Sequence, residues 1–166
     1  MKSDSIKIFI TGGTIDNLGY ADNKDAPINH KSLISSLLKQ SRLTINNDSV
    51  VLMQKDSRFV NDEDRKEILR QIQQSTEQRI VITHGTLTMT KTASFLAKAN
   101  LKKTVVLLGS AVPASKENSD ALCNLGAAIS VVQILPYGVY ITMNGKIFTA
   151  DNVKKNLKTG IFEEIK

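Results

Sequence analysis

Short apolar runs alternate along the chain with longer amphipathic stretches, and this alternation predicts a mixed α/β protein. The apolar runs have the length of buried strands. They are Ile6–Ile10, Val50–Met53, Ile80–Thr83, Val105–Leu108 and Val139–Met143. Runs that are apolar at almost every position are typical of strands in a parallel sheet whose two faces are both covered.

The stretches between the strands carry apolar residues at helical spacing. The expected inward positions are Leu33, Ile34, Leu37 and Leu38 in a first helix, Ile68, Leu69 and Ile72 in a second, and Ala93, Leu96 and Ala97 in a third. The third is expected over Thr90–Ala99 and a fourth over Ser119–Val132. Asn29 and Asn61 are the expected N-caps of the first two, and acidic residues follow Asn61 in the first turn.

The order of these elements predicts the fold class. Strand and helix alternate with short links, which is typical of a single doubly wound parallel sheet, flavodoxin- or Rossmann-like, with helices on both faces. Asn144-Gly145 is a favoured two-residue turn, so a C-terminal β-hairpin is expected to return through Lys146–Phe148. One domain is expected over residues 1–166, with the charged tail Asp151–Lys166 packed partly against the core.

Composition and charge exclude several classes of protein. Apolar residues make up 41% and charged residues 23%, as in a soluble globular protein, and no apolar run approaches the length of a membrane span. The net charge of +6 is spread along the chain, and aromatic residues are only 5%, so we expect neither nucleic-acid nor membrane binding. The positive charge can attract anionic substrates.

The N-terminal residues and the cysteine content indicate a location. The apolar run Ile6–Ile10 is too short for a signal peptide, and no small-residue cleavage site follows it. The single Cys123 cannot form an internal disulfide and is expected to be a buried, reduced thiol. A cytoplasmic location is therefore expected.

Two glycine–threonine turns, Thr11–Thr14 and His84–Thr86, follow the first and third strands. Ligands of doubly wound sheets bind beyond the carboxyl ends of the strands near the switch point, where these two strands are expected to be neighbours. A threonine hydroxyl becomes a nucleophile only when a base removes its proton. The candidate bases are His30, His84 and Lys155, and the lysine would need a pKa lowered by burial.

Each of these features also has an ordinary structural explanation when it is taken alone. A Gly-Gly turn often only reverses the chain or binds a phosphate, a lone His84 is more often hydrogen-bonded in the core, and Lys155 would be solvated. A nucleotide site at Thr11–Thr14 has little support, because the chain lacks a G-x-G-x-x-G or Walker pattern.

Taken together, the segments resemble the L-asparaginase family. The segments that carry the resemblance are IFITGGTID (8–16), KDSRFVNDED (55–64), HGTLTMTKTASFLA (84–97), SDALCNLGAA (119–128) and NVKKN (152–156). The resemblance covers nearly the whole chain, and its motifs stand in the family's order. Typical members carry a second, C-terminal domain, so the length is most similar to the short-chain bacterial asparaginases, which consist of the N-terminal domain alone and act as oligomers.

The resemblance implies hydrolysis of the side-chain amide of L-asparagine to L-aspartate and ammonia through a threonine acyl-enzyme, without a metal or cofactor. The residues with implied catalytic roles are Thr14 as nucleophile, Tyr20 as its activator, and Thr86 with Lys155 as a proton-relaying pair. The residues with implied substrate-binding roles are Gly13, Ser57, Gly85 and Leu87, with Ser57 on the α-carboxylate. Backbone amides near Thr86 are expected to stabilise the oxyanion.

Leu87 departs from the family pattern, which has aspartate there. That aspartate orients the lysine and anchors the substrate's α-ammonium, and leucine does neither, so little or no asparaginase activity is expected. Three explanations stay open: an inactivating substitution, a change to a substrate that lacks the α-ammonium, or a non-catalytic binder of small molecules. Self-association into a homodimer or homotetramer is expected, because a site on one small domain is open to water and a partner subunit would enclose it.

Overall fold

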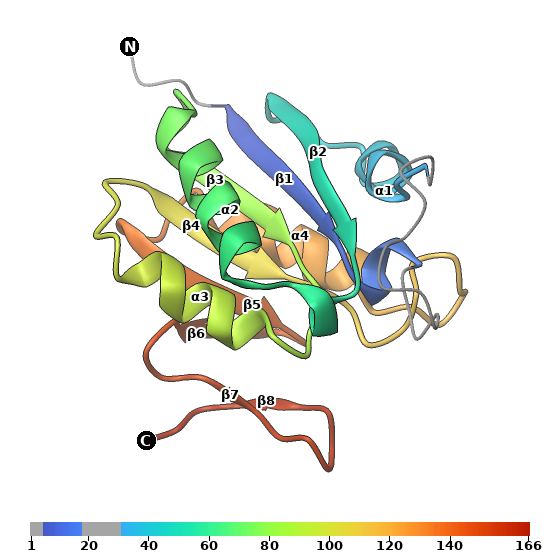
Figure 1. The fold of residues 1–166 in the computed structure, drawn as a ribbon. Helices are drawn as coiled ribbons and strands as arrows, with labels where there is room; N and C mark the ends of the chain where they lie inside the picture. Colours follow the sequence, from blue (N-terminus) through green and yellow to red (C-terminus); the bar gives the residue numbers. More distant parts are fainter. Residues whose placement is uncertain (1–4, 18–30) are drawn as a thin grey trace.

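Parallel strands form the centre of the molecule (Figure 1). A computed structural model describes residues 5–17 and 31–166. In this part of the chain a six-stranded sheet has the order β2-β1-β3-β4-β5-β6. The strands are β1 (Ile6–Gly12), β2 (Asn47–Lys55), β3 (Arg79–Thr83), β4 (Thr104–Leu108), β5 (Gly138–Met143) and β6 (Lys146–Thr149). All neighbours are parallel except β5 and β6, which form an antiparallel hairpin.

The strand order creates a switch point beside β1. The chain passes from β1 to β2 on one side and then returns to place β3 on the other side of β1. Ile10 of β1 lies opposite Thr83 of β3, so the turns that follow the two strands begin at the same height. The predicted adjacency of the first and third strands is therefore confirmed, and it brings both glycine–threonine turns to one edge of the sheet.

Helices cover both faces of the sheet, as the sequence predicted. The α-helices are α1 (Ile34–Gln40), α2 (Asp62–Gln74), α3 (Met89–Ala97) and α4 (Ala121–Val131), with short 3₁₀ turns η1 (Thr14–Asp16) and η2 (Ser57–Phe59). Helices α2 and α3 pack on one face, while α1 and α4 pack on the other (Figure 1).

The alternation of side chains along the strands divides the core into two layers. In β3, Ile80 and Ile82 belong to the layer under α2 and α3, whereas Val81 belongs to the layer under α1 and α4. All three are fully buried. A strand buried on both faces needs apolar residues at successive positions, which explains the continuous apolar runs of the sequence.

The predicted element boundaries hold best where a local signal marks them. Asn61 caps α2 in a reciprocal box: its side chain accepts from the Asp64 amide at 3.0 Å, and the Asp64 carboxylate accepts from the Asn61 amide at 2.9 Å. The turn at Asn144-Gly145 has the positive φ angles, 51° and 82°, that its sequence favours.

The first helix begins later than predicted. Helix α1 starts at Ile34, and Leu33 is its N-cap rather than a residue of its inner face. The amide of Leu33 instead donates to the Asp16 carboxylate at 2.6 Å, which ties the helix start to the turn after β1. Asn29, the expected cap, lies outside the described residues.

The C-terminal tail packs against the core, as predicted. It forms a small antiparallel pair of strands, β7 (Lys154–Lys155) and β8 (Phe162–Glu163). Val153 and Phe162 are 5% and 2% exposed and belong to the core layer under α2 and α3. These two apolar side chains anchor the pair of strands to the domain.

The expectation for Cys123 was wrong. Its side chain is exposed on α4, because this helix turns Asn124, Leu125 and Ala128 toward the sheet and leaves the preceding position on the solvent side. In the described ranges, no helix combines the length and the apolar character that a bilayer span requires.

Candidate active site

Three loops at the carboxyl edge of the sheet pack directly on one another. A Cβ atom added to Gly13, whose φ is 84°, would stand 2.4 Å from the Gly85 Cα atom. A Cβ added to Gly85 would stand 2.6 Å from the Ser57 Cβ atom. Only glycine permits these approaches, so the turns after β1 and β3 are in backbone contact, and the turn after β2 lies against the second of them.

Hydrogen bonds fix Ser57 to the turn after β3. Its backbone carbonyl accepts from the Thr88 hydroxyl at 2.7 Å, and its Oγ accepts from the Leu87 amide at 3.2 Å. Ser57 is only 3% exposed. Because its Oγ accepts from the amide, the serine hydroxyl keeps its own proton for donation to a ligand.

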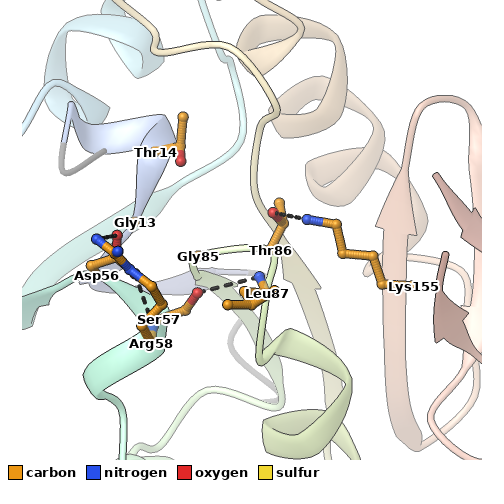
Figure 2. A pocket seen from close by; sticks show the side chains of 9 residues that line it. All are labelled: Gly13, Thr14, Asp56, Ser57, Arg58, Gly85, Thr86, Leu87 and Lys155. Atoms are coloured by element: carbon orange, nitrogen blue, oxygen red, sulfur yellow. Dashed lines mark hydrogen bonds and ion pairs between the residues drawn. The ribbon is translucent and has the colours of Figure 1, made fainter. Parts of the chain in front are cut away.

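The C-terminal tail contributes an amine to the same place. Lys155 Nζ donates a hydrogen bond of 2.7 Å to Thr86 Oγ1 (Figure 2). Desolvation lowers the pKa of Lys155 below its ordinary value, because partial burial disfavours the charged form. The two side chains that the family resemblance couples are thus brought into contact.

A pocket joins the predicted residues. It is lined by Gly13, Thr14, Asp56, Ser57, Arg58, Gly85, Thr86, Leu87 and Lys155 (Figure 2). The space that it encloses is small, about 50 Å³ against roughly 300–1,000 Å³ for typical ligand pockets, so the pocket is open to solvent and not a closed cavity. Seven of the eight residues singled out in the sequence line it. Tyr20, the eighth, lies outside the described residues, as does His30.

Thr14 is held in the pocket wall by the turn η1. The amide of Gly13 donates to the Lys55 carbonyl at 2.9 Å, and the next side chain, Ile15, is fully buried in the core. Asn17 ends the turn in the left-handed conformation, with its amide bonded to the Thr14 carbonyl at 3.0 Å. In the part of the chain that the structure describes, the Thr14 hydroxyl has no hydrogen-bond partner, so it is available to a ligand.

Leu87 is an apolar side chain in a polar pocket wall. It is 44% exposed, although its backbone amide is engaged by Ser57. Because so much of its side chain faces solvent, packing against neighbouring residues does not explain a leucine at this position.

Sequence reasoning missed two charged residues of the pocket, Asp56 and Arg58. Asp56 caps η2 by accepting from the Arg58 amide at 2.8 Å, and its other oxygen accepts from the Arg58 guanidinium at 3.1 Å. The available signal was their position, since polar residues directly after a strand lie at the ligand-binding edge of such a sheet.

His84 does not line the pocket and serves as a structural residue. Its Nδ1 donates to the Gly85 carbonyl at 2.8 Å, because a carbonyl can only accept, so its Nε2 accepts from the Thr92 hydroxyl at 2.9 Å. Thr92 in turn accepts from Arg65 Nε at 3.2 Å. Complete burial and, to a smaller extent, the charge of Arg65 lower the pKa of His84 to about 4, although its bond to Gly85 opposes them.

The His84 network therefore supports the loop rather than supplying a base. The carbonyl that His84 holds belongs to the peptide between Gly85 and Thr86, so the network orients the backbone of the pocket wall. Residues 5–17 and 31–166 contain no group of three or more His, Cys, Asp or Glu side chains that could hold a metal ion.

Comparisons with known proteins agree with the motifs. A sequence model of the family described as "Asparaginase, N-terminal" matches residues 5–162. A glutaminase-asparaginase of Pseudomonas fluorescens biotype A is 30% identical over 98% of this chain and 49% of its own length.

Solved structures resemble the fold as well. L-asparaginase I from Vibrio cholerae has a TM-score of 0.82 and 26% identity over 97% of this chain and 51% of its own. A probable cytoplasmic L-asparaginase from Campylobacter jejuni has a TM-score of 0.77 and 31% identity over 96% of this chain and 52% of its own. The chain thus spans about half the length of the relatives it matches.

Proposed function

The chain belongs to the asparaginase family, and from this premise we propose that it hydrolyses a side-chain amide through a threonine acyl-enzyme, with L-asparagine as a poor substrate. The observation that carries the proposal is that Thr14, Thr86 and Lys155 line one pocket, with the lysine amine bonded to the Thr86 hydroxyl. The non-catalytic alternative is not favoured, because the matched relatives named above are enzymes by name.

The reaction has two steps. The Thr14 oxygen attacks the amide carbon, the C–N bond breaks, and the nitrogen leaves as ammonia after it takes up a proton. Water then attacks the ester, which releases the acid and restores the Thr14 hydroxyl. The two steps use the same relay in opposite directions, since the group that accepts a proton in one returns it in the other.

Lys155 and Thr86 move the proton in this mechanism. A lysine with a lowered pKa is more often neutral, and only the neutral amine accepts a proton from a hydroxyl. The Thr86 hydroxyl accepts from the amine, so its own proton can point to the substrate. Tyr20 is the proposed second activator of Thr14.

Ser57 is the proposed ligand of the substrate's α-carboxylate. It is buried, it is held by the turn after β3, and its hydroxyl proton is available for donation. Backbone amides beside Thr86 are the proposed donors to the oxyanion.

Leu87 limits the activity toward asparagine in this proposal. No carboxylate stands at this position to hold the lysine in one orientation, and positioned proton transfer contributes about 10²–10⁴-fold in rate. An α-ammonium that loses water against the leucine without a new acceptor costs about 1–3 kcal/mol.

The mechanistic assignment is tested by comparing the rate of ammonia release from L-asparagine between the unaltered chain and the Leu87→Asp variant. We expect the variant to be faster by at least about tenfold. Leu122→Asp is the matched control, because Leu122 is a leucine of similar exposure, 36%, on α4 outside the pocket. If Leu87→Asp brings no gain over this control, the mechanistic assignment fails.

Self-association is a further part of the proposal. The pocket is open to solvent on one small domain, and a second copy of the chain would supply the missing wall. We expect a dimer or tetramer by light scattering, and a monomer at working concentration would contradict this.

A further inference from the structure

The charges that line the pocket point to the kind of ligand it accepts. Asp56 is the only carboxylate among its described lining residues. Arg58 engages both oxygens of that carboxylate, one through its backbone amide and one through its guanidinium. Both carboxylate oxygens of Asp56 therefore already accept a hydrogen bond from Arg58.

The same wall also holds two basic side chains. Arg58 and Lys155 both line the pocket, and among the described residues no carboxylate forms an ion pair with Lys155. Because the described carboxylate of this wall is paired with Arg58, the wall offers no unpaired negative charge to a ligand ammonium.

The side chain of Leu87 has no acceptor atom that could bind an ammonium group of the ligand. Its apolar side chain is 44% exposed in the wall beside Ser57, whose hydroxyl is available to a ligand carboxylate. A ligand whose carboxylate binds Ser57 would bring a neighbouring α-substituent against this wall. A hydrogen there costs nothing, whereas an ammonium loses water without gaining an acceptor.

We propose that the pocket takes ω-amides of dicarboxylic acids that carry no α-ammonium group. The member that corresponds to asparagine without its amino group is succinamate, the monoamide of butanedioic acid. The proposal rests on the proposed amide hydrolysis and adds its substrate class. The C–N bond of succinamate breaks, its carbonyl carbon gains an oxygen from water to give succinate, and its nitrogen takes up a proton and leaves as ammonia.

Turnover of the two amides provides the first test, with the full chain. We expect kcat/KM for succinamate to exceed that for L-asparagine by at least about tenfold. The α-ammonium of asparagine is desolvated without a hydrogen-bond partner, whereas succinamate has no such group. Leu87→Asp should reverse the preference, and Leu122→Asp should leave it unchanged. A chain that hydrolyses both amides but prefers L-asparagine overturns the inference and leaves the amide hydrolysis standing.

Binding of the product acids gives a test that does not depend on turnover. By calorimetry we expect succinate to bind at least about tenfold more tightly than L-aspartate. Arg58→Met should narrow this difference, because it removes one cation and releases the Asp56 carboxylate for an ammonium. Tighter binding of L-aspartate to the unaltered chain, or binding of neither acid, overturns the inference.

The two tests separate the inference from the proposed function. Selective succinate binding without hydrolysis of any amide, even in Leu87→Asp, would support the ligand class and contradict the catalytic assignment.

Discussion

Lys155 Nζ lies 2.7 Å from Thr86 Oγ1, although the two residues are 69 positions apart in the chain. The lysine reaches the threonine because Val153, two residues before it, is buried in the core and fixes the direction of β7. Lys155 also pairs with Phe162 of β8, which is buried in the core, and directly opposed residues of an antiparallel pair point to the same face.

Removal of this amine is expected to abolish most turnover. In Lys155→Met, we expect the rate of ammonia release from the better of the two amides to fall about 10²–10⁴-fold, because the proton relay is lost. Lys154→Met is the matched control, since Lys154 is exposed in the same strand. Equal rates in the two variants would contradict the role of Lys155.

The pH dependence of turnover is expected to report the lysine. Desolvation lowers the pKa of Lys155, so kcat/KM should rise with pH and level off below the ordinary pKa range of lysine. In Leu87→Asp the added carboxylate favours the ammonium, so the midpoint of the rise should move to higher pH. A midpoint that does not move in a series of initial rates would show that residue 87 does not influence the amine.

Stability is expected to fall with acidity through His84. Its pKa is about 4 in the folded chain against an ordinary value of 6.5, so between these pH values the unfolded chain binds more protons. The free energy of unfolding should therefore decrease as pH falls through this window, by on the order of 2 kcal/mol from pH 7 to pH 5. Urea midpoints at the two pH values measure the change.

The His84→Asn variant distinguishes the contribution of His84 to the pH dependence of stability from that of other titrating groups. His84→Asn is less stable at both pH values, because it breaks the bonds to Gly85 and Thr92, but its stability should change much less between pH 7 and 5. An unchanged pH dependence would assign the effect to another group. The bonds to Arg70 chiefly lower the pKa of Glu67 to about 2, so the stability linked to its titration is lost mainly below pH 5, outside the range from pH 7 to pH 5.

The contact between the turns is expected to be intolerant of a methyl group. Gly85→Ala places a Cβ atom 2.6 Å from Ser57 Cβ, which must displace the turn after β2. We expect loss of succinate binding in calorimetry together with a lower melting temperature. Gly126→Ala is the control, because a Cβ at this helical position meets nothing within 4 Å, and it should stabilise the chain by about 0.5–1 kcal/mol. Normal binding by Gly85→Ala would refute the tight packing of the site.

Much of the fold follows from local patterns. The continuous apolar runs predicted all five parallel strands, and the Asn61 cap and the Asn144-Gly145 turn each predicted a boundary. The start of α1 was mispredicted, because the turn after β1 supplies its amide partner through Asp16, which no local signal reveals. Cys123 was misplaced because a lone thiol carries no pattern that distinguishes the two sides of a helix.

The sequence by itself determined the strands, the helices and the order of the glycine–threonine turns, because burial imposes a period on the residues of each element. The tertiary structure alone decided that Lys155 meets Thr86, that Ser57 accepts from the Leu87 amide, and that His84 is enclosed as a structural residue. Such contacts depend on how separate elements pack, and packing joins residues whose separation along the chain leaves no periodic trace.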